Sequence, residues 1–438
     1  MKYVSVKHKS PAVSFQQALF TGIAPDGGLY IPEKMPRLSK EIIENLSSFS
    51  LHEIGYEILK LFIDDVPAVE LKKWIENALQ FPIPLVKLTD RIFLLELFHG
   101  PTLAFKDVGA RFMAQAMSYY LAQQQREITL LAATSGDTGS AVAHGFYRVP
   151  RVAVYVLYPS GKISPLQEKQ MTTLGENIHA VEVAGTFDDC QRLVKESLVD
   201  EQLISQCHLT TANSINLGRL LPQIIYYAWA IIQWQKMGLT PLPKFVVPSG
   251  NFGNITAAAY AKQLGIPMAG LIAATNANDV VPHYFATGEF KPTSSKATLS
   301  NAMDVGNPSN FARLQALYEL DSIPLRNAIE AISIADESTF NEIKNSYESS
   351  QVILDPHTAV GVAAARQLLD NPVEKAPMIV VATAHPAKFI EVVEKAIQKK
   401  IPLPLALSKA LSLPKRSIFL SDPHYATWIK CLQEQLKK

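Results

Sequence analysis

The chain has very little cysteine. Its 438 residues include only three cysteines, Cys190, Cys207 and Cys431, which lie far apart in the sequence. Such a set forms neither a disulfide framework nor a CxxC pair, so it excludes the small disulfide-rich secreted class of protein. Sparse cysteine suits a reducing compartment, and we therefore expect a cytoplasmic location.

The sequence also lacks an excess of either charge and lacks long apolar runs. Lysine and arginine total 41 residues against 40 aspartate and glutamate residues, without a basic stripe. Nucleic acid and anionic membrane surfaces are therefore not expected as partners. The first residues, MKYVSVKHKSPAVSFQQ, lack the apolar core of a signal peptide, and no apolar run is long enough to span a membrane. Histidines show no HExxH or similar spacing, so no metal site is expected.

What the sequence does contain, after residue 85, is an alternation of apolar strands with helical patterns. This alternation predicts an α/β fold whose parallel sheets carry helices on both faces, with binding sites at the carboxyl ends of strands. Residues 1–85 instead predict a mainly helical N-terminal subdomain, with helices at about 39–49, 51–63 and 67–79. We expect strands at 92–98, 128–132, 152–157, 178–183, 244–247, 270–274, 352–354 and 378–382.

Lys106 lies in an apolar setting between a predicted buried strand and a predicted helix, for which Asp107 is a reasonable N-cap. Both burial and the positive end of a helix dipole disfavour an ammonium ion. A lysine kept partly neutral is a nucleophile for aldehydes, as Schiff-base chemistry requires. The alternative is a lysine whose stem packs on the core while its amine reaches water.

Two turns share the pattern Ser-Gly-Asp/Asn-x-Gly, at residues 135–139 and 249–253. Each follows an apolar strand and opens a helix of small residues, so free backbone N–H groups point outward and favour an anion. The pair therefore predicts two anionic groups, although either turn alone could be an ordinary strand-to-helix connection. Neither turn fits GxGxxG or the P-loop pattern, which argues against dinucleotide or ATP binding.

Two further segments are candidates. Thr383 follows the last predicted strand, where its hydroxyl could bond a ring nitrogen or simply cap the next helix. His99, His357 and His385 lie in turns, where a structural hydrogen bond is the default. Residues 288–310 form a long loop, and a loop of that length is usually functional or mobile.

The segment HGPTLAFKDVGARFM (99–113) resembles the cofactor-lysine segment of the threonine synthases, pyridoxal-phosphate enzymes with the tryptophan-synthase-β type of fold. TGIAPDGGLYIP (21–32) resembles a segment specific to their longer subgroup, and the resemblance extends over essentially the whole chain. It implies two open sheets, with a small cofactor domain at 105–213 and a large domain formed by 86–104 and 214–438. It also makes Lys106 the Schiff-base residue for pyridoxal 5'-phosphate.

The remaining site residues follow from the same resemblance. SGNFGN resembles the cup for the cofactor phosphate, and ATAHPAKF resembles the loop that places a hydroxyl, here of Thr383, at the pyridine nitrogen. Shorter relatives have asparagine at the position of Asp137, beside the cofactor's ring hydroxyl, and an ionised aspartate could accept but not donate a hydrogen bond there. The implied residues are Gly250, Asn251, Phe252, Gly253 and Asn254 for the cup, Thr134, Ser135 and Thr138 for the substrate carboxylate, and Asn213, Ser214 and Arg219 for the substrate phosphate.

The resemblance implies conversion of O-phospho-L-homoserine and water to L-threonine and phosphate, by a monomer or a homodimer. Lys106 would move the protons, and the cofactor would absorb the negative charge at carbon. Two alternatives stay open. One is a phospholyase of the same fold that releases a keto acid, and the other is a non-catalytic binding module that keeps the fold.

Overall fold

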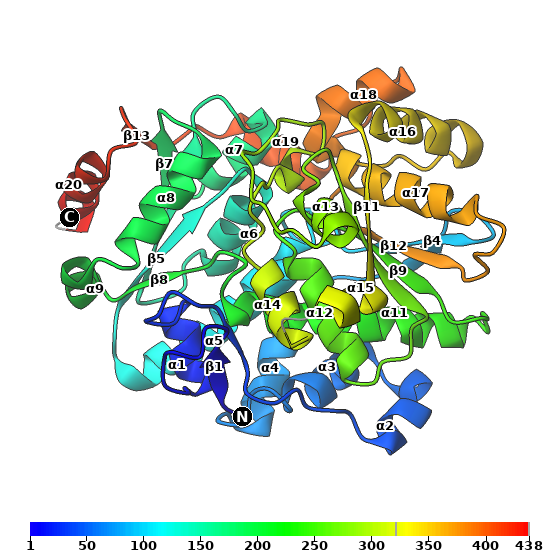
Figure 1. Cartoon of the computed structure of the whole chain (residues 1–438). Coiled ribbons are helices and arrows are strands. Elements are labelled where there is room, and N and C mark those ends of the chain that lie inside the picture. The colour runs from blue at the N-terminus through cyan, green and yellow to red at the C-terminus, as the bar shows by residue number, and fades with distance from the viewer. Residues whose placement is uncertain (320–321, 437–438) are drawn as a thin grey trace.

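Two separate β-sheets form the framework of the chain and lie side by side with helices around both (Figure 1). The computed structural model describes residues 1–319 and 322–436. In this part of the chain, no helix is both long enough and apolar enough to cross a membrane. The α/β class with mainly parallel sheets, predicted from the alternating elements, is confirmed.

The smaller sheet has five parallel strands in the order β13-β7-β6-β5-β8. Four of these strands are consecutive in the chain, whereas β13 arrives from the C-terminus and pairs with β7. The strands are β5 (Ile128–Ala133), β6 (Val152–Pro159), β7 (Ile178–Val183), β8 (Leu209–Thr211) and β13 (Ile418–Leu420). The accompanying helices are α6 (Asp137–Phe146), α7 (Pro165–Thr172), α8 (Phe187–Ser197), α9 (Glu201–Cys207), α19 (Leu405–Ser412) and α20 (Tyr425–Leu436).

The larger sheet has six strands in the order β11-β10-β9-β12-β4-β3, with β3 antiparallel to its neighbour and the others parallel. The strands are β3 (Leu85–Lys87), β4 (Ile92–Glu96), β9 (Lys244–Pro248), β10 (Gly270–Thr275), β11 (Ile329–Ser333) and β12 (Met378–Ala382). The helices that connect or cover them are α10 (Leu217–Leu220), α11 (Ile224–Lys236), α12 (Gly253–Gln263), α13 (Val280–Thr287), α14 (Phe311–Leu317), α15 (Ser322–Ala328), α16 (Asp336–Ser350), α17 (Pro356–Leu369) and α18 (Ile390–Ile397).

The central strands are apolar throughout because both of their faces are covered. In β9, Phe245 and Val247 join the main core, while Val246 between them joins the core under α16–α18. In β5, Leu130 joins the main core and Leu131 the core under α8 and α20. Successive side chains of a strand point to opposite faces, so a strand between two layers of helices needs apolar residues at every position.

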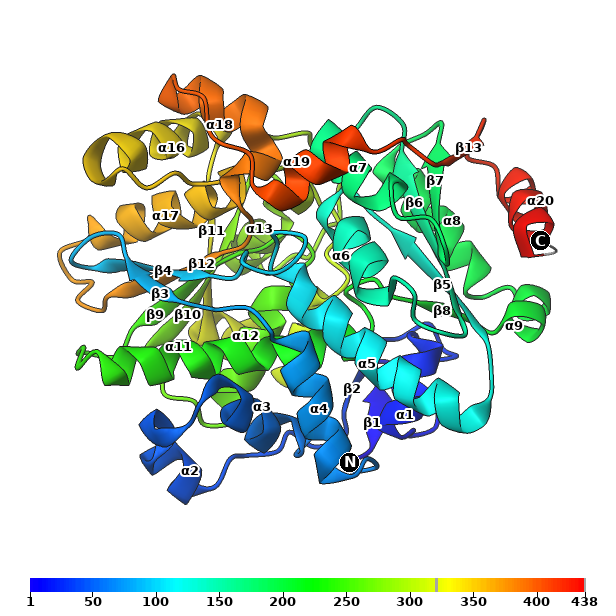
Figure 2. The same cartoon turned by 180° about the vertical axis from the view of Figure 1, so that it is seen from behind.

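The N-terminal subdomain packs along one edge of the molecule (Figure 1). It comprises β1 (Tyr3–Ser5), α1 (Phe15–Thr21), β2 (Tyr30–Pro32), α2 (Lys40–Glu44), α3 (Leu51–Leu59) and α4 (Ala68–Ala78). The helix α5 (Lys106–Gln124) runs between α4 and α6, as Figure 2 shows from behind. Arg111 of α5 donates hydrogen bonds to the carbonyl oxygens of Asn77 and Ala78, so it satisfies the end of α4 and ties the subdomain to the helix that begins at Lys106.

Two local predictions were wrong. The segment 352–354 is not a strand but the connection from α16 to α17, and the sheet edge is formed instead by β11, most of whose residues are only partly buried or exposed. The apolar residues of 352–354 pack at a helix junction, which a short apolar run cannot distinguish from a strand. Asp107 is not an N-cap, because α5 already begins at Lys106 and the Asp107 carboxylate accepts hydrogen bonds from the backbone N–H and hydroxyl of Thr102.

Candidate active site

One cavity opens where the two sheets meet, at the carboxyl ends of their parallel strands. Parallel strands of one sheet end at the same edge, so loops distant in sequence converge there. The cavity encloses about 1010 Å³, including the part open to solvent. Of the predicted site residues, it is lined by Lys106, Ser135, Asp137, Thr138, Asn213, Ser214, Arg219, Gly250, Asn251, Phe252, Gly253, Asn254 and Thr383.

Lys106 is positioned by a short backbone pairing between its own segment and the loop after β12. The Phe105 N–H donates to the Thr383 carbonyl oxygen at 2.9 Å, and the His385 N–H donates to the Leu103 carbonyl oxygen at 3.0 Å. Lys106 is then the first residue of α5, and its side chain is 16% exposed. Its amine faces the cavity and does not extend from the core into bulk water, contrary to the alternative of an amphipathic surface lysine.

The electrostatics at Lys106 involve one carboxylate and two other cations. Burial lowers the pKa of the Lys106 amine, Asp137 opposes this effect, and the charges of Lys388 and Arg219 add to it. The Lys106 Nζ lies 3.6 Å from Asp137 Oδ2. Burial alone would raise the pKa of Asp137, but the charges of Lys388 and Lys106 outweigh it and lower that pKa. The site therefore holds an ionised carboxylate next to an amine that loses its proton more easily than an ordinary lysine does.

Lys388 is a charged residue of the site that no sequence motif had indicated. It lies in the 3-10 helix η4 (Pro386–Phe389) after β12, is fully buried, and places its Nζ 2.8 Å from Asp137 Oδ1. The same amine donates to the Thr102 carbonyl oxygen at 2.7 Å. In the sequence, Lys388 is marked only by its place five positions after Thr383 within ATAHPAKF (382–389), and a lysine there is equally typical of a helix surface.

The predicted phosphate cup lies between β9 and the start of α12. Phe252 has a left-handed backbone with φ of 58°, and Gly250 approaches the backbone of Met303 so closely that a Cβ there would lie 2.6 Å from the Met303 Cα. The first N–H groups of α12 have no acceptor within the helix. The Asn254 side chain accepts hydrogen bonds from two tyrosine hydroxyls, of Tyr226 and Tyr227, through its Oδ1, while its buried Nδ2 has no partner among the described residues. The cup therefore presents unused donors, which suit an anion.

The predicted substrate-phosphate residues lie next to this cup. Arg219 is only 2% exposed, so it is not the helix-surface arginine that a lone sequence position would suggest. Its Nη1 donates to the Ala212 carbonyl oxygen at 2.6 Å, whereas its buried Nε has no partner in the part of the chain that the structure describes. Burial lowers the pKa of Arg219 to about 10, partly opposed by Asp107. A buried guanidinium with an unused donor is suited to an anion.

The residues of the 134–139 turn have two different roles. Ser135, Asp137 and Thr138 line the cavity. Thr134 is not among the lining residues, because its buried hydroxyl accepts hydrogen bonds from the N–H groups of Gly136 and Gly139, at 2.9 and 2.8 Å. The structure thus gives Thr134 the task of shaping the turn.

Thr383 lines the cavity and is 6% exposed. The alternative role, the cap of the following helix, belongs instead to His385, whose Nδ1 accepts from the Ala387 N–H at 3.1 Å. The Thr383 N–H donates to the Thr358 hydroxyl at 3.3 Å, which fixes the backbone of the loop. Thr383 is thereby held at the cavity wall.

The long loop contributes a wall of the cavity that the sequence indicated only as a whole segment. Its inner part, residues 301–305, lines the cavity together with His357. His357 Nε2 accepts from the Ala302 N–H at 3.1 Å, and its Nδ1 lies 2.8 Å from Asp355 Oδ1. The structural hydrogen bond predicted for His357 is therefore present and anchors the loop, although His357 lies in the first turn of α17 and not in a connecting turn. Other residues line the cavity without having been predicted as site residues; they are Phe187, Gln191 and Gln223, and, next to predicted residues, Phe105, Ala133 and Pro248.

A largely buried lysine with a lowered pKa, set between two sheets and opposite a helix N-terminus that suits phosphate, is the arrangement of a pyridoxal-phosphate-dependent enzyme. The family model described as "Pyridoxal-phosphate dependent enzyme" matches residues 78–384. The models described as "Threonine synthase N terminus" and "Threonine synthase, C-terminal" match residues 2–79 and 358–428.

Individual relatives agree with these models. The threonine synthase of Serratia marcescens is 45% identical over 415 residues, which cover 94% of this chain and 95% of the relative. The crystal structure of threonine synthase from Escherichia coli superposes with a TM-score of 0.92 at 40% identity, covering 99% of this chain and 100% of that chain. The pyridoxal-phosphate-bound threonine synthase from Brucella melitensis gives a TM-score of 0.91 at 35% identity, with 99% of each chain covered. The chain belongs to the threonine synthase family of pyridoxal-phosphate-dependent lyases, as its motifs predicted.

The residues present fit the cofactor of this family. Its phosphate needs several N–H donors, and the cup offers the N-terminus of α12 and the unpartnered Asn254 Nδ2. Its aldehyde needs an amine that loses a proton readily, and burial gives Lys106 that property.

Proposed function

We propose that this cleft converts O-phospho-L-homoserine and water to L-threonine and phosphate, with Lys106 as the residue that binds the cofactor and moves the protons. The observation that carries the proposal is the largely buried Lys106 amine, which faces a cavity lined by two glycine-rich turns suited to anions. The residue roles below rest on that arrangement and on the family to which the chain belongs.

The cofactor, when bound, supplies an electron sink for charge that develops on the substrate carbons. The 249–254 cup would hold its phosphate, and the Thr383 hydroxyl would lie at its ring nitrogen. A hydroxyl in place of a carboxylate at that nitrogen favours the unprotonated ring and so limits side reactions such as transamination. Asp137, kept ionised, would accept a hydrogen bond from a donor beside Lys106.

The remaining residues would bind and orient the substrate. Ser135 and Thr138 would hold its carboxylate, and Asn213, Ser214 and Arg219 would hold its phosphate. Lys106 would then take the proton from Cα, and it is the natural group to return a proton later in the reaction. Exclusion of bulk water protects a reactive intermediate, and the 301–305 wall would provide it.

Product analysis tests the reaction. The purified protein, loaded with pyridoxal 5'-phosphate, is incubated with O-phospho-L-homoserine, and the products are separated by amino-acid analysis. L-Threonine with an equal amount of phosphate is expected. Formation of 2-oxobutyrate in place of threonine would instead identify a phospholyase. An absence of both products would favour the non-catalytic binding module.

Borohydride reduction tests the role of Lys106. Reduction of the yellow loaded protein should fix the cofactor covalently to the peptide that contains Lys106, as read by mass spectrometry. Recovery of the cofactor on another lysine would overturn the assignment. Three points remain predictions: the cytoplasmic location, the domain bounds and the choice between monomer and homodimer. The three cysteines, all within the described residues, form no disulfide.

A further inference from the structure

Asp137 uses its two carboxylate oxygens differently. Oδ1 lies 2.8 Å from Lys388 Nζ and accepts a hydrogen bond from Gln167 Nε2 at 2.9 Å. Oδ2 lies 3.6 Å from Lys106 Nζ. Two donors therefore hold one oxygen, and the other faces the amine that would bind the cofactor.

The donors are themselves fixed. Lys388 is fully buried and also donates to the Thr102 carbonyl oxygen, which receives a second hydrogen bond from Gln170. Gln167 is packed against Gly136, where a Cβ would come within 2.4 Å of the glutamine side chain. Gly136 also has a φ of 133°, which disfavours any other residue. The carboxylate thus has little freedom to turn.

We propose that Lys388 is a positioning residue for the reaction: as the buried countercharge of Asp137, it limits how strongly that carboxylate holds a proton at Lys106. Its ammonium ion lies against Oδ1, while Oδ2 faces Lys106. This role goes beyond the proposed function, because it gives a task to a residue that does not line the cavity. It rests on the proposed role of Lys106.

The arrangement fixes the sign of the effect on Lys106. Without Lys388, the Asp137 charge acts on Lys106 unopposed, and a proton at the Lys106 nitrogen is held more tightly. Without the Asp137 charge, Lys388 repels that proton unopposed, and it is held less tightly. Two other charges act on the pair, since Arg219 lowers the pKa of Lys106 and His357 lowers the pKa of Asp137. Lys388 itself lowers the pKa values of Asp107, His144 and His385, and none of these residues is substituted in either variant.

The test uses the loaded enzyme and its visible absorbance, which reports the protonation of the nitrogen that joins Lys106 to the cofactor. Lys388→Met should raise the midpoint of the absorbance titration by about one pH unit, tenfold in proton affinity, and Asp137→Asn should lower it by a similar amount. The double variant should return close to the wild-type midpoint. Lys244→Met is the matched control, because Lys244 pairs with Glu330 and Glu374 at the opposite end of β9.

Shifts of the same sign in both single variants, or a wild-type midpoint in Lys388→Met, would overturn the proposal. If Lys388→Met does not fold, the absorbance titration is repeated with Lys388→Gln, which should also raise the midpoint. The lowered midpoint of Asp137→Asn then provides the comparison that decides the proposal. Thermal unfolding of the cofactor-free proteins provides a second readout, in which the double variant should lose less stability than the two single losses together. A wild-type protein without the visible band would count against the proposed function, whereas this unfolding cycle would still test the Lys388–Asp137 pair.

Discussion

Asn251 and Ser214 join the predicted phosphate cup to the predicted substrate-phosphate segment. The Asn251 Nδ2 donates to the Ser214 Oγ at 2.7 Å, and the Asn251 Oδ1 accepts from the Ser309 N–H at 2.6 Å. A single side chain therefore connects the loop after β9, the segment before α10 and the end of the long loop. The two predicted anion sites are therefore neighbours that share a wall, and binding at one is expected to order the other.

Arg219 is expected to determine the affinity for the substrate phosphate. Arg219→Ala should leave cofactor binding intact but cost about 2–5 kcal/mol in kcat/KM, the scale for removing one partner of a buried charge pair. Inhibition by inorganic phosphate should weaken in parallel, since phosphate would use the same pocket. Arg219→Lys should recover only part of the loss, because a point charge cannot reproduce the planar fork.

The control for Arg219 is an arginine that bonds backbone carbonyls away from the cavity. Arg111 donates to the carbonyl oxygens of Asn77 and Ala78 and does not line the cavity. Arg111→Lys should therefore change thermal stability without a specific change in phosphate inhibition. Wild-type kinetics in Arg219→Ala would move the phosphate site elsewhere in the cleft.

Thr383 is expected to act through one hydrogen bond. Thr383→Ala should keep the fold and much of the cofactor but reduce turnover roughly tenfold, because a single hydrogen bond contributes about 0.5–1.5 kcal/mol. Thr383→Ser keeps the hydroxyl and should stay near wild type, whereas Thr383→Asp should favour the protonated ring and increase transamination. Turnover and product ratio are measured for all three. Unchanged values in both the alanine and aspartate variants would exclude a role at the ring.

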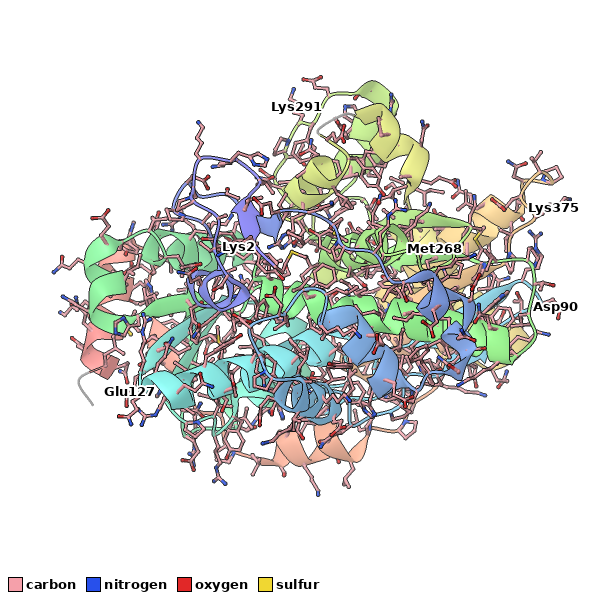
Figure 3. All side chains as sticks on the ribbon, turned by 90° about the horizontal axis from the view of Figure 1, so that it is seen from below. Lys2, Asp90, Glu127, Met268, Lys291 and Lys375 are labelled. Carbon is pink, nitrogen blue, oxygen red and sulfur yellow. The ribbon has the colours of Figure 1, made fainter. Side chains whose placement is uncertain are left out.

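The long loop is expected to close over the substrate. Its outer part is exposed, with Lys291 at the surface in Figure 3, and one backbone group of this part is held where the Lys296 N–H donates to Asn278 Oδ1 at 2.7 Å. Nicking by subtilisin at 288–295 should slow when a phosphonate analogue of the substrate is added. Cleavage at the exposed turn 371–375 is the internal control and should not change. Equal rates at 288–295 with and without saturating analogue would argue against closure.

His144 is expected to make the protein less stable in acid. Burial lowers its pKa to about 4, with a smaller opposing effect from a hydrogen bond to the Gln170 backbone. The unfolded chain then binds more protons than the folded chain between pH 6.5 and about 4, so the free energy of unfolding falls as pH falls through this window, by at most about 3 kcal/mol. His144→Gln should remove this part of the pH dependence, measured by denaturant unfolding. The exposed His283→Gln should not, and identical profiles for His144→Gln and wild type would contradict the assignment.

Sequence patterns were sufficient where structure is decided by neighbouring residues. The strands at 178–183 and 378–382 begin and end as predicted, because continuous apolar runs bounded by turn residues specify buried strands. The motifs around Lys106 and Asn251 predicted the family, which the family models and relatives confirm. The strand bounds and the family motifs depend on contiguous residues, so they can be predicted from the amino-acid sequence alone.

Only the tertiary structure decided which distant residues share an environment. Lys388 approaches Asp137 because β12 and β5 end at the same cleft, and His385 caps its helix in place of Thr383 because the paired backbone of Leu103 and His385 directs the loop. Burial of a charge, its balance by another and the direction of a carboxylate oxygen all depend on three-dimensional packing. The helix and strand propensities of neighbouring residues do not specify such packing, because the partners come together only when the two sheets meet.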